Sequence, residues 1–168
     1  MRNIELKARC PDLARAEAVC RRLGAELQWT RRQTDVYFRV PDGRLKLRTE
    51  SPGEAVLVSY HRPDVAAARD SLYEVTPVAN ANETLASLAE QHGILARVEK
   101  ARTLYLLDNV RIHLDSVDGL GTFIEFEAVM GPGHDDGEAQ ALIERLRREL
   151  GIAEGDLLSG SYGDMMPG

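Results

Sequence analysis

The stretch GRLKLR, residues 43–48, alternates basic side chains with leucines. In a β-strand, side chains at alternate positions share one face. A strand here would therefore place Arg44, Lys46 and Arg48 in a row on one face and both leucines on the other. What this row faces decides the fold, because three like charges side by side need either water or a bound anion.

The size and charge of the chain narrow the class of protein. A chain of 168 residues can form one domain with its own core, so we expect a single domain over residues 1–168. A formal net charge of -6 argues against binding to nucleic acid or to an anionic membrane. Neither a signal peptide nor an apolar run long enough to span a bilayer is visible, which favours a cytoplasmic protein.

Most of the chain alternates with period two and is punctuated by turn residues, which predicts strands joined by short antiparallel connections. The expected strands cover residues 3–9, 34–40, 44–50, 55–62, 72–78, 97–107, 110–117 and 122–129. Three segments have apolar residues at helical spacing instead, and the expected helices cover residues 12–23, 82–92 and 138–150. The fold class is therefore α+β.

Nearly every expected strand has one charged face and one apolar face. The charged faces collect Glu5, Lys7, Arg9, Asp35, Tyr37, Arg39, Arg44, Lys46, Arg48, Tyr60, Arg62, Glu74, Thr76, Lys100, Arg102, Arg111, His113, Asp115, Glu125 and Glu127. One interpretation is an open sheet whose charged face is in water. However, three short helices cannot cover a wide flat sheet, and its edges would need protection. Closure removes the edges, so we expect an eight-stranded antiparallel closed β-barrel, a tunnel with a charged lumen and helices packed outside.

In this assignment the lumen holds more cations than acids, inside a protein with a negative net charge. An enclosed cationic surplus is stable only with bound anions or a water-filled interior. A chain of linked phosphates fits best, because arginine can donate two hydrogen bonds to phosphate oxygens and lysine supplies a compact charge.

The acids of the lumen suggest a second role. Glu125 and Glu127 in FIEFEAV share a face, and Glu5 in NIELKAR could complete the cluster. Mg²⁺ or Mn²⁺ prefers carboxylates together with water and phosphate oxygens. The alternative is that each carboxylate forms an ion pair with a neighbouring strand. The four histidines have no common spacing for a metal, so structural or surface roles are expected for them. Trp29 and Tyr162 either stack on a base or pack within the fold.

In combination, several short motifs resemble the CYTH family of triphosphate tunnel metalloenzymes, and most of all its class IV adenylate cyclase-like branch. They are NIELKAR, GRLKLR, EKARTLY, RIHLD, GLGTFIEFE and SYGDMM, which together extend over most of the chain. The resemblance implies an eight-stranded antiparallel tunnel, a triphosphate substrate and a divalent metal. It gives no role for SYGDMM.

The resemblance also implies roles for single residues. The opening E-x-E-x-K of the family falls on Asn3, Glu5 and Lys7, so the first acid is missing here. This substitution puts the strength of the metal site in doubt. Phosphate-binding positions of the family fall on Lys7, Arg39, Lys46, Arg48, Arg62, Lys100 and Arg102, and metal-binding positions on Glu5, Glu125 and Glu127.

Two residues are candidates for catalysis. Lys7 could act as a general base, because neighbouring cations lower the pKa of a lysine, but it could equally be an ordinary phosphate-binding lysine. Asp115 matches an inner acid of the family, and it could orient the nucleophile or bind metal.

Three functions remain open. The first is a class IV adenylate cyclase-like enzyme that converts ATP to cyclic AMP and pyrophosphate. The second is a triphosphatase that hydrolyses tripolyphosphate or an organic triphosphate, since both reactions need the same electrostatic cradle. The third is a non-catalytic module that binds polyphosphate or nucleotide, which the missing acid at position 3 makes credible. Association into a homodimer is also left open.

Overall fold

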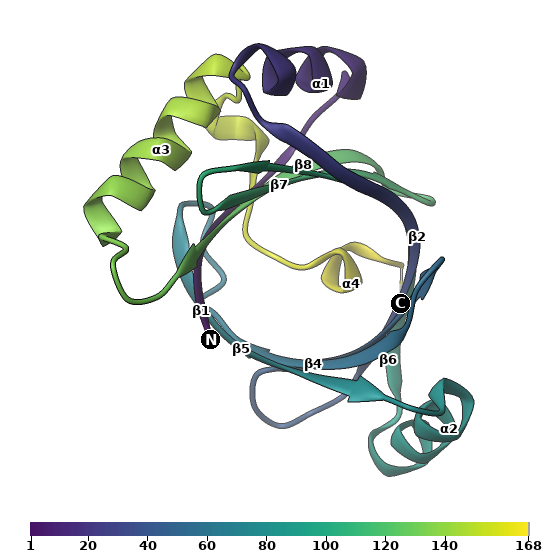
Figure 1. The fold of residues 1–168 in the computed structure, drawn as a ribbon. Helices are drawn as coiled ribbons and strands as arrows, with labels where there is room; N and C mark the ends of the chain where they lie inside the picture. Colours follow the sequence, from purple (N-terminus) through teal and green to yellow (C-terminus); the bar gives the residue numbers. More distant parts are fainter. Residues whose placement is uncertain (168) are drawn as a thin grey trace.

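The computed structural model describes residues 1–167 and shows a ring of strands around a central tunnel (Figure 1). The eight strands of the ring are β1 (Arg2–Arg9), β2 (Glu26–Phe38), β3 (Arg44–Ser51), β4 (Ala55–His61), β5 (Arg69–Val78), β6 (Ile94–Leu107), β7 (Val110–Val117) and β8 (Gly121–Met130). A short strand β9 (Leu157–Leu158) pairs with β1.

Hydrogen bonding between neighbouring strands closes the sheet on itself. The strands follow the order β5-β4-β3-β2-β6-β7-β8-β1, and β1 pairs with β5 as well. The closing pair joins Arg2 to Leu72 and Glu5 to Arg69, and all these pairings are antiparallel. The expected closed antiparallel barrel is therefore confirmed.

Some strands begin earlier than their sequence pattern indicates. β2 starts at Glu26 instead of residue 34, because its polar first half is held by pairing with β6 despite having no regular apolar face. β5 starts at Arg69 instead of residue 72, since its first residues pair with β1. Strand pairing thus overrides weak local patterning at these two sites.

The apolar faces of the strands point outward and pack under helices, as expected. α1 (Leu13–Arg22) and α3 (Asp136–Glu149) cover one side of the barrel, where strand and helix residues form one buried cluster. α2 (Ala81–His92) lies on the opposite side, against Leu47 and its neighbours. Asp12, Asn80 and Asp135 cap the three helices through their side chains. α2 begins at Ala81, so Asn82, the first residue of the expected helix, lies in its first turn.

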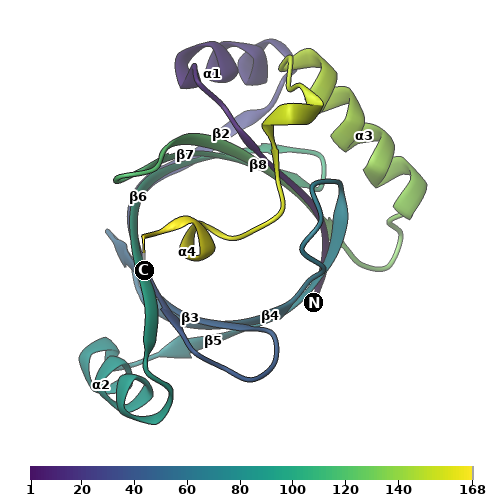
Figure 2. The same ribbon diagram turned by 180° about the vertical axis from the view of Figure 1, so that it is seen from behind.

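The carboxy-terminal segment crosses the inside of the ring. After a 3-10 turn (Glu154–Asp156), it forms the short helix α4 (Tyr162–Met165), which lies within the ring of strands in both views (Figures 1 and 2). Tyr162 packs there with Tyr37, Val98, Val117 and Phe123. These residues lie toward the end of the barrel at which β1 and β7 finish. We call it the closed end, and the opposite end the open end.

Among residues 1–167, no helix is both long and apolar enough to cross a membrane.

Candidate active site in the barrel lumen

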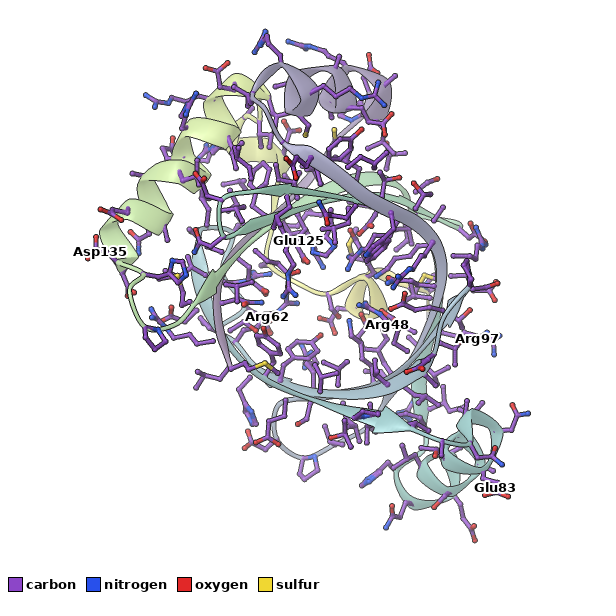
Figure 3. The ribbon with its side chains drawn as sticks, viewed as in Figure 1. Arg48, Arg62, Glu83, Arg97, Glu125 and Asp135 are labelled. Carbon is purple, nitrogen blue, oxygen red and sulfur yellow. The ribbon has the colours of Figure 1, made fainter. Side chains whose placement is uncertain are left out.

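A cavity of about 320 Å³ occupies the barrel between the closed end and the open end. Nine of the predicted site residues line it: Glu5, Lys7, Lys46, Arg48, Arg62, Lys100, Arg102, Glu125 and Glu127. Figure 3 shows Arg48, Arg62 and Glu125 pointing into the ring, whereas Glu83, Arg97 and Asp135 lie outside it. Side chains that are far apart in the sequence therefore meet in one space.

The structure does not bring Arg39 to the cavity. β2 ends at Phe38, so Arg39 lies outside the strand and the alternation of strand side chains does not apply to it. Arg39 is exposed, and its backbone N–H donates to the carbonyl oxygen of Gly93, 3.0 Å away, just after α2.

The predicted inward face of β5 is wrong by one residue. Tyr73 and Val75 line the cavity, and Glu74 between them is exposed. The shift follows from the pairing of Tyr73 with Tyr60, which faces inward from β4. Because side chains alternate with period two, an offset of one residue moves every side chain of a strand to the other face.

Several cations gather around one buried carboxylate, Asp35. Its oxygens lie 2.8 Å from Arg48, 3.2 Å from Lys46 and 3.3 Å from Lys100. Burial opposes ionisation of Asp35, but these cations outweigh it and hold its pKa well below the ordinary value. A single acid cannot neutralise three cations, so this part of the cavity, the cation cluster, keeps a positive surplus.

The surroundings of the two lysines in the cation cluster disfavour their charged form. Burial, followed by repulsion from Arg48, lowers the pKa of Lys46 to about 8. Burial and repulsion from Arg102 lower the pKa of Lys100 well below its ordinary value. A bound polyanion would reverse both effects, because an opposite charge nearby favours the ammonium form.

Across the cavity, acids gather beside a histidine. His113, Glu125 and Glu127 each offer a ligand atom, and these atoms all lie within 4.8 Å of one another. Glu5 is paired across the strands with Glu127. Burial, together with repulsion from Glu125 and Glu127, raises the pKa of Glu5 to about 7. We call these four residues the acid cluster.

The acid cluster fits a divalent cation. Carboxylate oxygens and a neutral imidazole are ordinary metal ligands. Burial, and then repulsion from Arg102, lowers the pKa of His113, which favours its neutral form. The side-chain oxygen Oδ1 of Asn3 is buried and has no hydrogen-bond partner among the described residues, while its Nδ2 donates to Glu127 at 3.2 Å. A positive ion would relieve the crowding of negative charge that raises the pKa of Glu5.

His113 was missed as a candidate metal ligand in the sequence analysis because only the spacing of the histidines along the chain was considered. The alternation of RIHLD had already placed His113 on the charged face. In the structure it stands opposite Glu125 on the next strand and contacts Glu127. The useful signal was a shared face with the two glutamates, not the distance along the chain.

Lys7 lies between the acid cluster and α4. Its Nζ atom is 3.5 Å from Glu125 and 4.0 Å from the ring centroid of Tyr162. Burial lowers the pKa of Lys7, and Arg62 adds repulsion. A buried lysine with a lowered pKa is able to accept a proton, as a general base must.

Asp115 faces the lumen but does not reach the cavity. Arg102 donates two hydrogen bonds of 2.8 Å to its carboxylate, and the hydroxyl of Tyr162 donates a third of 2.7 Å. Asp115 is fully buried. Its surroundings suit a group that orients Arg102 and Tyr162.

Two arginines near the closed end are incompletely paired. Arg62 donates to Glu5 at 3.1 Å, but its Nε and Nη2 have no partner among the described residues. Arg69 donates to the carbonyl oxygens of Val65 and Ser159. The expected start of β5 at residue 72 excluded Arg69 from the predicted lumen.

Comparison with known proteins agrees with this architecture. The chain is 21% identical over 171 residues to a predicted adenylate cyclase of Methanocaldococcus jannaschii, covering 96% of this chain and 97% of that protein. A solved structure of a Pyrococcus horikoshii protein superposes with a TM-score of 0.87 at 23% identity, covering 98% and 99% of the two chains. A predicted adenylyl cyclase of Hippeastrum, described as having a dominant triphosphatase activity, superposes with a TM-score of 0.64 at 18% identity, covering 95% and 91%.

The two structural likenesses establish a shared fold. The family model for the CYTH domain matches residues 1–162, which is nearly the whole chain. The chain therefore belongs to the CYTH domain family.

Proposed function

We propose that this protein is a metal-dependent enzyme that binds a linear triphosphate in the tunnel and, as a class IV adenylate cyclase-like enzyme, converts ATP to cyclic AMP and pyrophosphate. The observation that carries the proposal is the pair of opposite charge surpluses that line one cavity, the cation cluster and the acid cluster. A metal–triphosphate complex has matching charges, with a cation attached to a polyanion. Membership of the CYTH family supports the same substrate class.

The cation cluster would hold the phosphates. Lys46, Arg48 and Lys100 share a single carboxylate, so they retain capacity for phosphate oxygens. Arg102 is fixed by two hydrogen bonds to Asp115, which presents its guanidinium in one orientation. Positioning and charge stabilisation are the main contributions that an enzyme makes to phosphoryl transfer.

The acid cluster would hold Mg²⁺ or Mn²⁺ through Glu125, Glu127 and His113, with Glu5 beside them. When bound, such an ion supplies charge neutralisation for phosphate oxygens. These residues would orient it and keep it beside the cation cluster. The identity of the ion is part of the proposal.

Cyclisation would form a bond between the ribose 3′-oxygen and the α-phosphorus of ATP. The bond from the α-phosphorus to the bridging oxygen of the β-phosphate would break, and pyrophosphate would leave with the bond electrons. The proton of the 3′-hydroxyl needs an acceptor, and we assign this role to the neutral form of Lys7, whose pKa is lowered by burial. We assign Asp115 a positioning role, because it orients Arg102 and Tyr162 from behind the cavity wall.

A triphosphatase is the second candidate. It would use the same two clusters to align water with a phosphorus of tripolyphosphate or of an organic triphosphate. The activity described for the Hippeastrum protein favours it, because that protein shares this fold. A third candidate, a non-catalytic polyphosphate-binding module, is favoured by Asn3, which lacks the charge of the acid found there in the family.

A product assay tests these candidates. The protein is incubated with Mg²⁺ or Mn²⁺ and either ATP or tripolyphosphate, and cyclic AMP, pyrophosphate and orthophosphate are resolved. Cyclic AMP with equimolar pyrophosphate is the expected result. Orthophosphate release without cyclic AMP would replace the cyclase with the triphosphatase. Tight binding without turnover of either compound would support the binding module.

A further inference from the structure

The inner faces of β4 and β5 differ from the rest of the lumen. Val56 and Val58 from β4, and Tyr73 and Val75 from β5, line the same cavity as the cation cluster. We call these four residues the apolar wall. On β1, β3, β6, β7 and β8, charged or titratable side chains contribute to the cavity lining, as Lys46, Lys100 and Glu125 do.

Packing within the fold does not account for the apolar wall. None of its four residues belongs to the buried apolar clusters of residues 1–167. Val75 remains 41% exposed although it lines a cavity inside the ring, and the other three are only partly buried. Apolar side chains that stay accessible within a charged tunnel are more readily explained by a ligand than by the core.

The apolar wall stands directly beside the phosphate-holding cations. Val58 is the cross-strand partner of Lys46, and Val56 is the partner of Arg48. Val75 is in turn the partner of Val58 on the next strand. Side chains of directly opposed residues in an antiparallel pair lie within contact distance of each other. A molecule bound to Lys46 through a phosphate would therefore have its adjoining group against these valines.

We infer that the apolar wall is a subsite for the organic group of the substrate, which makes that substrate an organic triphosphate such as a nucleoside triphosphate. This inference rests on the proposed function and deepens it. Inorganic tripolyphosphate has no apolar group, so it would leave the apolar wall without a partner. A nucleobase or a similar flat group would remove the valine side chains of the apolar wall from water, which favours binding.

A second apolar surface lines the same cavity. Trp29 of β2 is paired with Leu104 of β6, and both residues line the cavity. The guanidinium of Arg31 lies 4.4 Å from the centre of the Trp29 ring, so that face of the ring is covered. Trp29 and Leu104 extend the apolar contact available to an organic group at the open end of the tunnel.

The test compares two ligands that share a triphosphate and differ in the organic group. Calorimetry measures the Kd of the Mg²⁺ complexes of ATP and of tripolyphosphate, over times in which phosphorus NMR shows that each ligand remains intact. The variant Val58→Thr/Val75→Thr keeps the shape of both side chains and their preference for strands, and it changes only their polarity. Val65→Thr is the matched control, because Val65 is exposed and does not line this cavity.

In the double variant, the Kd of ATP is expected to rise about tenfold, a factor typical of small changes in an apolar pocket. The Kd of tripolyphosphate should stay within about twofold of the wild-type value. Val65→Thr should change neither value. An equal loss for both ligands, or no loss for ATP, would overturn the inference while leaving the proposed function standing. Failure of the wild type to bind either ligand would overturn the proposed function, and the inference with it.

Discussion

The two clusters in the lumen differ in the sign of the charge that each concentrates: positive in the cation cluster and negative in the acid cluster. In the cation cluster, Asp35 is surrounded by more positive charge than it can balance, and the pKa of Lys46 falls to about 8. In the acid cluster, carboxylates crowd together and the pKa of Glu5 rises to about 7. In each cluster at least one buried group is thus disfavoured in its charged form, and a ligand of the opposite sign would favour that form. The two clusters together match a metal–polyanion complex better than either component alone.

Charge reversal in the cation cluster should have the largest effect. Lys46→Glu places a second carboxylate beside Asp35, so the affinity for triphosphate should fall by about a thousandfold or more, since it removes one attraction and adds one repulsion. Lys46→Gln removes only the attraction and should lose roughly tenfold to a hundredfold. Calorimetry with Mg²⁺-tripolyphosphate measures both changes.

The control for charge reversal is Arg97→Glu. Arg97 lies outside the ring and pairs with Glu99 on the surface of β6 (Figure 3). It should leave triphosphate affinity within about twofold, because exposed charges are screened by water and salt. Unchanged affinity in Lys46→Gln, with thermal unfolding showing a folded protein, would mean that the row in GRLKLR does not bind phosphate.

Neutralising the acid cluster should weaken metal binding next most strongly. Glu127→Gln removes the charge of one proposed ligand and also its ion pair with His113. The Kd for Mn²⁺, measured by electron paramagnetic resonance without any triphosphate, should rise by about a hundredfold. Glu99→Gln on the outer surface should have no effect. Equal Mn²⁺ binding by the two variants would exclude Glu127 as a ligand.

Sequence alternation predicted the barrel and most of the lumen because it is a local property that the fold retains. The inward orientation follows from alternation along the strand, as GRLKLR indicates for Lys46 and Arg48 and EKARTLY for Lys100 and Arg102. Arg39 does not face inward, because the strand ends before it, and strand ends depend on pairing. Glu74 faces out because the register of β5 with β4 is set across the sheet.

Other features of the site depend on tertiary packing and have no local signal. The SYGDMM segment brings Tyr162 into the lumen, where its hydroxyl reaches Asp115. Nothing in those six residues indicates where the chain will return. The proximity of His113 to the two glutamates could have been predicted, because the expected charged face holds His113, Glu125 and Glu127 together. The apolar wall was not predicted, because the expected inward face of β5 was wrong by one residue and so excluded Tyr73 and Val75.

Loss of the Tyr162 ring should have a moderate effect on turnover. Tyr162→Leu removes the aromatic face beneath the ammonium of Lys7, so kcat for the converted triphosphate should fall about tenfold with less than about twofold change in KM. Tyr162→Phe keeps the ring and loses only the hydrogen bond to Asp115, so it should retain most of kcat. Steady-state kinetics separates the two constants.

If Tyr162 only stabilises the closed end, both variants should lower the thermal unfolding temperature while kcat stays unchanged. That outcome would remove its positioning role. A rise in KM alone would also contradict it, because Tyr162 would then act on substrate binding and not on Lys7.

The raised pKa of Glu5 predicts a smaller, pH-dependent effect. The folded protein binds the Glu5 proton more tightly than the unfolded chain does, so this group stabilises the fold at low pH. Its contribution is fully present below the ordinary pKa and is lost as pH rises toward about 7. Without metal, the free energy of unfolding should therefore decline over this range. Glu5→Gln should flatten the decline, and denaturant unfolding at several pH values measures it. The same slope in both proteins would show that Glu5 is not the group responsible.

Asn3→Glu should produce the smallest change, and it sharpens the contrast between the clusters. Asn3 is 2% exposed and its Nδ2 donates to Glu127 at 3.2 Å, so a glutamate there adds another acid to a crowded group and removes a hydrogen bond. Without metal the variant should be less stable. With Mn²⁺ its affinity should rise by a few fold, because an added charged ligand strengthens a hard-cation site. Thermal unfolding with and without Mn²⁺ reports both effects in one experiment. If stability falls by the same amount in both conditions, position 3 does not contact the metal. The amide of Asn3 then does not lower the metal affinity of this chain. If Mn²⁺ restores the loss, the acid cluster of the present chain is a metal site held below its attainable affinity by a single uncharged side chain.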